Sequence, residues 1–244
     1  MIALITPTGE RFNQIKSCVS FMKRQTYKGD ILWVIVDDGE KSSISFLDLP
    51  INSFPKNWKI VTVFPNPKWR LGQNTQSRNL QEGINVVKQY SEVTNIYIIE
   101  DDDFYFPNYL EVMEEKMQGV LAASEIHTIY YNVKTMNFIY NRNSKHGSLF
   151  QTAFKPSLIP IFEKVLEEHP KFIDMHFWNL IQTMRINLFK AEKVLSVGIK
   201  GLSGRPGIGS GHIQKYVDIP TGDKRAEKLK LLKSLIGMDY LLYL

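Results

Sequence analysis

The feature that most constrains this fold is a short apolar run that ends in four consecutive acidic residues. Residues 96–99 read Ile-Tyr-Ile-Ile, and such β-branched and aromatic runs are typical of a buried strand. Glu100, Asp101, Asp102 and Asp103 follow directly. Four carboxylates cannot continue into a core without compensating charge. We therefore predict an acidic cluster at the carboxyl end of a buried strand, with something positive beside it.

A divalent cation is one such positive partner. Mg²⁺ and Mn²⁺ prefer carboxylate oxygens, and they usually take one or two from the protein and the rest from water and substrate phosphates. The alternative is a solvated acidic turn that caps a helix beginning near Pro107, because proline and acids both suit a first helical turn. The residues alone leave both interpretations open.

Strands and helices alternate through the first half of the chain. The hydrophobic spacing predicts strands at residues 2–6, 31–36, 59–64 and 96–99, and helices at residues 11–25 and 74–90. This alternation indicates an α/β fold with a doubly wound, mostly parallel sheet. Asp37 and Asp38 end the second strand, as the acidic run ends the fourth. Ligands bind beyond the carboxyl ends of such strands, so we expect both acidic groups at one binding edge.

The second half of the chain has a different pattern. It predicts antiparallel strands within residues 128–141, helices at 157–168 and 174–184, and a last strand at 194–199. A glycine-rich loop follows from Gly201 to His212, and its amides together with Arg205 could wrap an anion. Residues 221–244 predict an amphipathic, basic helix. We expect one domain over residues 1–220, with halves 1–110 and 111–220, followed by that helix.

Composition narrows the class of protein. The 244 residues are 43% hydrophobic, which is enough for a substantial core, and the net charge of +5 permits binding to a polyanion without requiring it. No stretch approaches the roughly 20 apolar residues that span a bilayer, and no signal peptide is evident, so we expect a cytoplasmic protein.

The single cysteine, Cys18, excludes an internal disulfide, and its flanking pattern predicts a buried helix position. Neither GxGxxG nor GxxxxGK[ST] occurs, which argues against dinucleotide-binding folds and P-loop enzymes.

Four motifs, in this order, resemble those of the nucleotide-diphospho-sugar transferase fold called GT-A, and most of all glycosyltransferase family 2. They are TPTG at residues 6–9, VDDG at 36–39, GQNTQSRN at 72–79 and EDDDFYFP at 100–107. The resemblance is strong over residues 1–110, looser over 145–215, and absent from the C-terminal helix. It implies a GT-A fold with an antiparallel extension on the acceptor side.

The resemblance also implies roles for individual residues. Aligning Pro107 with the family's proline makes Glu100-Asp101-Asp102 the DxD triplet, with Glu in place of its first acid. Asp102 then holds Mn²⁺ or Mg²⁺, helped by Glu100 or Asp103. In several GT-A enzymes a histidine after such a loop is a third ligand, which implies His212; the alternative is a surface histidine. The residues expected to bind the nucleotide are Thr6, Pro7, Asp37, Asp38, Arg78, Asp101 and, from the glycine-rich loop, Arg205.

An inverting transferase needs a carboxylate that removes the proton of the acceptor hydroxyl. The family supplies it from the start of a helix well beyond the DxD triplet, and Asp174 is the best-placed candidate in this sequence. A purely structural alternative is that Asp174 is the N-cap of that helix, since Asp is a preferred capping residue. The two roles are compatible.

The function that this resemblance implies is metal-dependent transfer of a hexosyl or pentosyl group from a nucleotide diphosphate sugar, with a UDP-sugar favoured. The first candidate acceptor is a hydroxymethylated pyrimidine in DNA, because the basic last helix and Lys68-Trp69-Arg70 offer cations and an aromatic ring. The other is a saccharide or lipid-linked acceptor, with the basic helix touching a membrane surface. The rival classes are a metal-dependent nucleotidyltransferase or nuclease and a non-enzymatic, basic nucleic-acid-binding domain.

Overall fold

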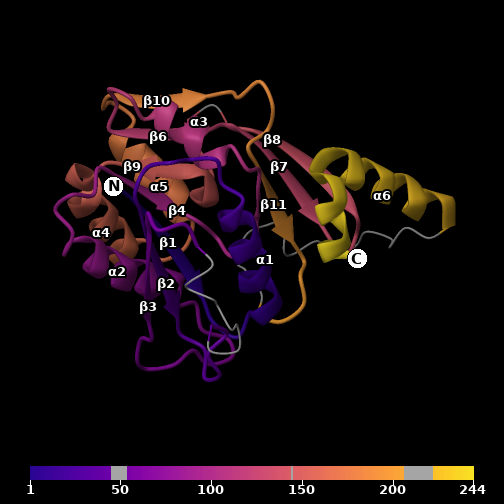
Figure 1. Cartoon of the computed structure of the whole chain (residues 1–244), viewed down its shortest axis with the longest axis horizontal. Helices are drawn as coiled ribbons and strands as arrows, with labels where there is room; N and C mark the ends of the chain where they lie inside the picture. Colours follow the sequence, from indigo (N-terminus) through magenta and orange to yellow (C-terminus); the bar gives the residue numbers. More distant parts are fainter. Residues whose placement is uncertain (45–53, 144, 206–221) are drawn as a thin grey trace.

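The computed structural model has a mixed α/β fold built around a seven-stranded sheet (Figure 1). It describes residues 1–44, 54–143, 145–205 and 222–244. In spatial order the strands of this sheet are β10 (Ile186–Phe189), β6 (Ala122–Glu125), β9 (Thr152–Phe154), β4 (Asn95–Ile98), β1 (Ile2–Thr8), β2 (Ile31–Asp37) and β3 (Trp58–Val63). Neighbours are parallel except where β9 pairs with β6 and β4, so the predicted, mostly parallel sheet is confirmed.

A second, four-stranded sheet extends the fold beside the first. Its strands, in spatial order, are β5 (Phe104–Tyr105), β11 (Ser196–Lys200), β7 (His127–Asn132) and β8 (Asn137–Arg142). Strands β7 and β8 form the predicted antiparallel pair, whereas β7 and β11 run parallel. Strand β5 directly follows the acidic run and pairs with β11, so the second sheet begins where the predicted site lies.

Helices cover both faces of the large sheet, and a further helix lies beside the second sheet (Figure 1). The helices on the large sheet are α1 (Phe12–Lys23), α2 (Gln76–Val87), α3 (Tyr109–Lys116), α4 (Ile159–Glu168) and α5 (Ile173–Ile181), and the helix beside the second sheet is α6 (Gly222–Ile236). Alternate side chains of β1 divide between two cores, because successive residues of a strand point to opposite faces. Ile2 and Leu4 pack in the core that includes α1 and α3, and Ala3 and Ile5 pack in the one that includes α2, α4 and α5.

The prediction of the last helix, over residues 221–244, is wrong at its C-terminal end. Helix α6 ends at Ile236, and Gly237 takes a φ of 64°, a left-handed conformation that a residue without a Cβ adopts readily. A 3₁₀ helix, η5 (Gly237–Tyr243), completes the chain. The short strands β5, β6, β9 and β10 were not predicted, because two to four residues are too few to show a period; β4 is as short as β6 and β10, but its unbroken apolar run was recognisable.

Gly83 offers a test of how closely α2 packs on β1. A Cβ built on Gly83 would lie 2.4 Å from Cγ2 of Ile5, which is well inside contact distance. Gly83→Ala should therefore destabilise the protein by about 1–3 kcal/mol, the usual cost of overpacking, although alanine is the better helix former. Urea unfolding measures this free energy.

The double variant Gly83→Ala/Ile5→Ala tests the same contact. It should lose less stability than the sum of the single variants, because Ile5→Ala removes the clashing methyl group. A single Gly83→Ala variant as stable as the wild type would show that the helix shifts freely on the strand.

Candidate active site at the carboxyl edge of the sheet

Both acidic groups lie at the carboxyl edge of the large sheet, as predicted. Strands β1, β2 and β4 run parallel side by side, with β1 in the middle. Asp38 follows the end of β2, and the acidic run from Glu100 to Asp103 follows the end of β4. The side chains of Asp38, Asp101, Asp102 and Asp103 are all buried. Each carboxylate therefore needs a partner within the protein or a ligand.

Asp38 is held by two arginines and a threonine. Its Oδ2 accepts a hydrogen bond from Nη2 of Arg78 at 2.9 Å, and its Oδ1 accepts one from Nη1 of Arg205 at 2.5 Å. The hydroxyl of Thr75 also donates to Oδ2. Burial alone would raise the pKa of Asp38, but the hydrogen bonds from Arg205 and Thr75 outweigh it and lower the pKa. Asp38 is therefore a carboxylate at neutral pH.

Arg205 connects the two halves of the chain at this point. It lies just after β11, and its guanidinium carbon is 4.8 Å from the ring centroid of Trp69. A Cβ on Gly9 would lie 2.1 Å from Oδ1 of Asp38, so only glycine permits the turn after β1 to approach this closely. The glycine of the TPTG motif therefore shapes the Asp38 site directly.

Arg11 compensates two acids of the acidic run. Its Nη2 lies 2.6 Å from Oδ2 of Asp102, and its Nε lies 3.2 Å from Oδ1 of Asp101. The hydroxyl of Thr8 donates to Asp101 Oδ2 at 2.7 Å. Burial alone would lower the pKa of Arg11, but the charges of Asp101 and Asp102 raise it above its ordinary value. The guanidinium is thus a fixed positive charge on this acid pair.

The other two acids have separate partners. Asp103 Oδ1 accepts the backbone N–H of Ile199 at 2.7 Å and lies 3.6 Å from Nζ of Lys200. Glu100 Oε1 accepts a hydrogen bond from Nε2 of Gln76 at 2.6 Å. Burial raises the pKa of Glu100 to about 7 and that of Asp103 well above its ordinary value, against the opposing effect of Lys200. These two acids therefore bind a proton more readily than exposed carboxylates do.

Asp174 lies near enough to the acidic run for its charge to act on Glu100, although it is distant from that run in sequence. Its charge contributes, after burial and Asp102, to raising the pKa of Glu100. Burial raises the pKa of Asp174 itself, opposed by the backbone N–H of Met175, which donates to Oδ1 at 2.9 Å. The N-cap of α5 is Phe172, and Asp174 is the second helical residue, so the capping interpretation is wrong.

Other predicted residues lie outside this acidic cluster. The hydroxyl of Thr6 accepts a hydrogen bond from the Trp33 indole at 2.9 Å inside the core. The carboxylate of Asp37 accepts its hydrogen bonds within its own turn, from the N–H of Gly39 at 3.1 Å and from the hydroxyl of Ser42 at 2.9 Å. Pro7 is a half-buried residue of β1. His212 lies outside the described residues, so its assignment stays a prediction.

Four residues of the site were missed in the sequence: Thr8, Arg11, Thr75 and Lys200. Thr8 and Arg11 lie within and just after the TPTG motif, so its position at a strand end was a usable signal. Thr75 lies inside the motif at residues 72–79. Lys200 carried no local signal, because only the pairing of β11 with β5 brings it to the acids.

The carboxylates of the acidic run are the type of ligand that a divalent cation prefers. Asp101 and Asp102 both line one cavity, and one or two carboxylates are what Mg²⁺ or Mn²⁺ usually take from a protein. Over the described ranges, no group of three or more His, Cys, Asp or Glu side chains is arranged to hold a metal ion. Any cation at Asp102 would have to compete with the guanidinium of Arg11.

Comparison with known proteins identifies a shared fold. No protein-family model and no curated protein sequence matches the chain. Among solved structures, S. aureus TarS matches 81% of this chain and 36% of its own, with 13% identity and a TM-score of 0.56. TarS 1–349 in complex with UDP matches 81% of this chain and 60% of its own, with 12% identity and a TM-score of 0.57.

TarS 1–349 in complex with UDP-GlcNAc matches 96% of this chain and 66% of its own, with 12% identity and a TM-score of 0.52. The chain thus spans from about a third to two thirds of the length of these TarS chains. At such low identity the likeness establishes the fold and no more.

The Arg11 ion pairs give a prediction on stability. Arg11→Gln leaves the carboxylates of Asp101 and Asp102 buried without their cation, which should cost about 3–5 kcal/mol of unfolding free energy at neutral pH. Lys16→Gln is the matched control, because it removes one positive charge from an exposed position of α1, the helix that Arg11 precedes, and should change stability by less than about 0.5 kcal/mol. Urea unfolding of both variants measures the difference. Equal, small losses would show that the acids are compensated by other groups.

Proposed function

We propose that this chain is a glycosyltransferase with a GT-A fold, and that its donor is a nucleotide diphosphate sugar, with a UDP-sugar favoured. The observation that carries the proposal is the meeting of the Asp38 cluster and the acidic run at one carboxyl edge of the sheet. The fold shared with TarS supports it, since TarS 1–349 has been solved with UDP and with UDP-GlcNAc. A donor of this class carries both a base with ribose and a diphosphate, which suits two adjacent polar sites.

The Asp38 cluster suits the nucleoside part of the donor. A buried carboxylate accepts hydrogen bonds from the N–H groups of a base or the hydroxyls of ribose. Trp69 offers an aromatic surface beside it, on which Arg205 now lies. Arg78 and Arg205 supply positive charge for the adjacent phosphates.

Asp102, helped by Glu100 or Asp103, is the residue that would hold Mn²⁺ or Mg²⁺, and Asp101 lines the same cavity as Asp102. When bound, the ion would neutralise charge on the departing diphosphate. Arg11 compensates the same carboxylates, so Arg11→Gln should bind Mn²⁺ more tightly than the wild type, as measured by calorimetry without substrate. Equal Mn²⁺ affinity of the variant and the wild type would show that the metal does not bind at these acids.

Asp174 is assigned as the base that takes the proton of the acceptor hydroxyl. Burial raises its pKa, which makes the carboxylate a stronger base than an exposed one. Asp174→Asn should keep nucleotide-sugar binding and lose about 10²-fold or more in transfer rate. Asp223→Asn is the matched control, since Asp223 also lies in a first helical turn but is exposed. Unchanged transfer by Asp174→Asn at saturating acceptor would exclude the role.

The donor is tested by a hydrolysis screen of UDP-, GDP- and dTDP-sugars with Mn²⁺ and with Mg²⁺. Release of a nucleoside diphosphate supports the proposal, and UDP should be the preferred product. Release of pyrophosphate or of a nucleoside monophosphate would favour the rival nucleotidyltransferase or nuclease. Binding without any turnover would exclude both enzyme classes.

The acceptor proposed first is a hydroxymethylated pyrimidine in DNA, against a saccharide or lipid-linked acceptor. The basic side chains of α6 favour a polyanion: Lys224, Arg225, Lys228, Lys230 and Lys233. Within the described ranges, no helix is long and apolar enough to cross a membrane. Labelled sugar should enter hydroxymethylated but not ordinary duplex DNA, and DNA affinity should fall steeply with salt, by about 0.9 log units per phosphate neutralised for each log unit of salt. If the protein binds no DNA at low salt, the DNA acceptor is excluded and the saccharide or lipid-linked acceptor becomes the leading choice.

A further inference from the structure

One face of the second sheet is turned toward the acidic run. Successive residues of a strand point to opposite faces of its sheet, and Ile199 of β11 packs in the core. Its neighbours Gly198 and Lys200 therefore point to the other face, where Nζ of Lys200 lies 3.6 Å from Oδ1 of Asp103. Gly198 pairs with Tyr130 of β7, so the side chain of Tyr130 lies on this same face.

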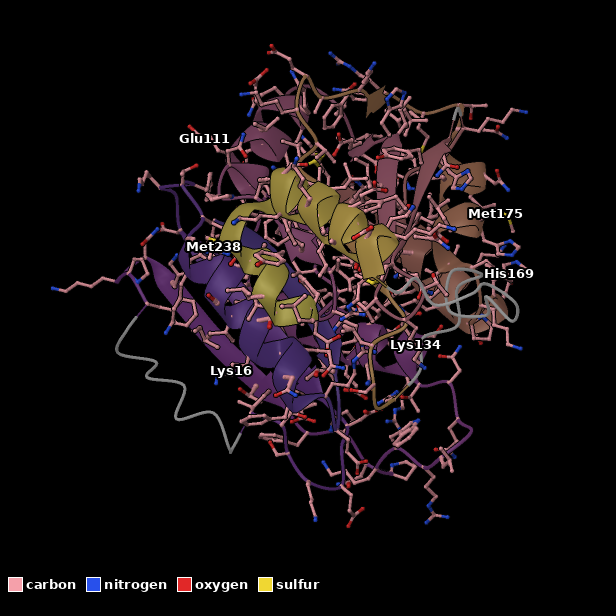
Figure 2. The ribbon with its side chains drawn as sticks, turned by 90° about the vertical axis from the view of Figure 1, so that its right-hand side faces the viewer. Lys16, Glu111, Lys134, His169, Met175 and Met238 are labelled. Atoms are coloured by element: carbon pink, nitrogen blue, oxygen red, sulfur yellow. The ribbon has the colours of Figure 1, made fainter. Side chains whose placement is uncertain are left out.

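The opposite face of the second sheet is closed by the C-terminal helix. Leu232 and Ile236 of α6 pack in the same core as Ile199. Figure 2 shows the yellow C-terminal segment lying across the indigo helix α1. On the other face, Tyr130 is half-buried and Ile139, its partner on β8, is 37% exposed. A ligand would therefore meet the second sheet on the face that carries Tyr130.

Tyr130 and the proposed base are fixed by neighbouring residues. The hydroxyl of Tyr130 lies 2.7 Å from Oγ of Ser148, which is hydrogen-bond distance. Burial raises the pKa of Asp174, and hydrogen bonds from the backbone of Met175 and of Leu149 oppose this rise. Ser148 and Leu149 are consecutive, so the phenol and the carboxylate of Asp174 meet at one short segment.

The ring of Tyr130 is also close to the acidic run. Nζ of Lys200, the partner of Asp103, lies 5.5 Å from the centroid of the ring. Burial raises the pKa of Tyr130 to about 12, against the opposing charge of Lys200. The charges of Asp103 and Asp174 raise it further, which places both acids near the hydroxyl. In the proposed reaction the transferred sugar lies between the departing diphosphate and the base, which is the position that this ring borders.

The sequence provides a dedicated place for this ring. A Cβ on Gly198 would lie 2.3 Å from Cδ1 of Tyr130, so the ring rests directly on the backbone of β11. Glycine weakens the interior of a strand and often marks such a close approach. Phe150 packs against the ring edge to face, with the centroids 6.1 Å apart. The ring is thus held in one orientation although part of it remains accessible.

We propose that Tyr130 is a substrate-binding residue, and that the transferred sugar of the donor packs on its ring. One face of a pyranose consists largely of C–H groups, which suit an aromatic surface, while the sugar hydroxyls bind polar neighbours such as Glu100 and Lys200. This inference rests on the proposed function for the class of ligand. It adds a residue from the second half of the chain, beyond the motifs at residues 6–107.

The test compares binding of UDP with binding of UDP-glucose, UDP-galactose, UDP-GlcNAc and UDP-xylose, measured by calorimetry with Mn²⁺ present. The wild type should bind at least one UDP-sugar more tightly than UDP. Tyr130→Leu should weaken that UDP-sugar about tenfold, the scale of one aromatic contact, and leave UDP unchanged. Tyr130→Phe keeps the ring and should bind both ligands as the wild type does.

Tyr140→Leu is the matched control. Tyr140 is also a strand tyrosine, but it follows Ile139 in β8 and so points to the opposite face, where it is 63% exposed. Its replacement should change neither affinity. Equal weakening of UDP and UDP-sugar by Tyr130→Leu would place the effect on the nucleotide or on folding and overturn the inference. A loss in Tyr130→Phe as large as that in Tyr130→Leu would assign the effect to the hydroxyl and also overturn it.

A second measurement uses the wild-type protein. In a spectrum of protein labelled with ¹³C in its tyrosine rings, the signal that is missing from Tyr130→Phe belongs to Tyr130. A sugar packed on the ring should shift this signal more with the UDP-sugar than with UDP. Equal shifts with the two ligands would show that the sugar does not contact the ring.

Failure of the proposed function gives a different pattern. If the wild type binds neither UDP nor any UDP-sugar, the proposed UDP-sugar donor is wrong and the inference fails with it. If the wild type binds UDP and every UDP-sugar equally, the nucleotide site stands and the sugar contact fails. If the wild type prefers a UDP-sugar and Tyr130→Leu keeps this preference, only the role of Tyr130 fails.

Discussion

The ion pairs between Arg11 and the two carboxylates of Asp101 and Asp102 are the interaction on which the rest of the site depends. Strand β4 carries four acids straight out of the core, and buried carboxylates are tolerated only with charge beside them. Arg11 precedes α1, so its pairing fixes the N-terminus of that helix over the end of β4. Lys200, at the end of β11 in the second sheet, compensates the charge of Asp103. Charge compensation thereby joins α1, β4 and β11 at one point.

The buried carboxylate of Asp38 is also compensated by nearby cations, which come from other parts of the chain. Arg78 comes from α2 and Arg205 from the segment after β11, and both reach a fully buried carboxylate. Cations from distant parts of the sequence therefore converge on acids at one edge of the sheet. Such an edge is suited to anionic ligands, because phosphate oxygens can replace carboxylates as partners of the same guanidinium groups. This arrangement supports the proposed nucleotide diphosphate donor.

The sequence predicted the parts of this arrangement that depend on local pattern. The apolar runs at residues 31–36 and 96–99 are unbroken, so β2 and β4 were evident, and the acids that end them had to meet at one edge of a parallel sheet. What could not be predicted was the partner of each acid. Lys200 reaches the site through the pairing of β11 with β5, which leaves no local signal. The break at Gly237 was missed because the apolar spacing continues beyond it.

Unsatisfied polar atoms also indicate where a ligand belongs. Among the buried side-chain atoms without a hydrogen-bond partner in the described ranges is Oδ2 of Asp103, which belongs to the acidic run. Folding alone does not favour such atoms, since an apolar replacement of the same shape would remove their desolvation cost. The presence of this oxygen in the acidic run is explained if a bound group completes its interactions.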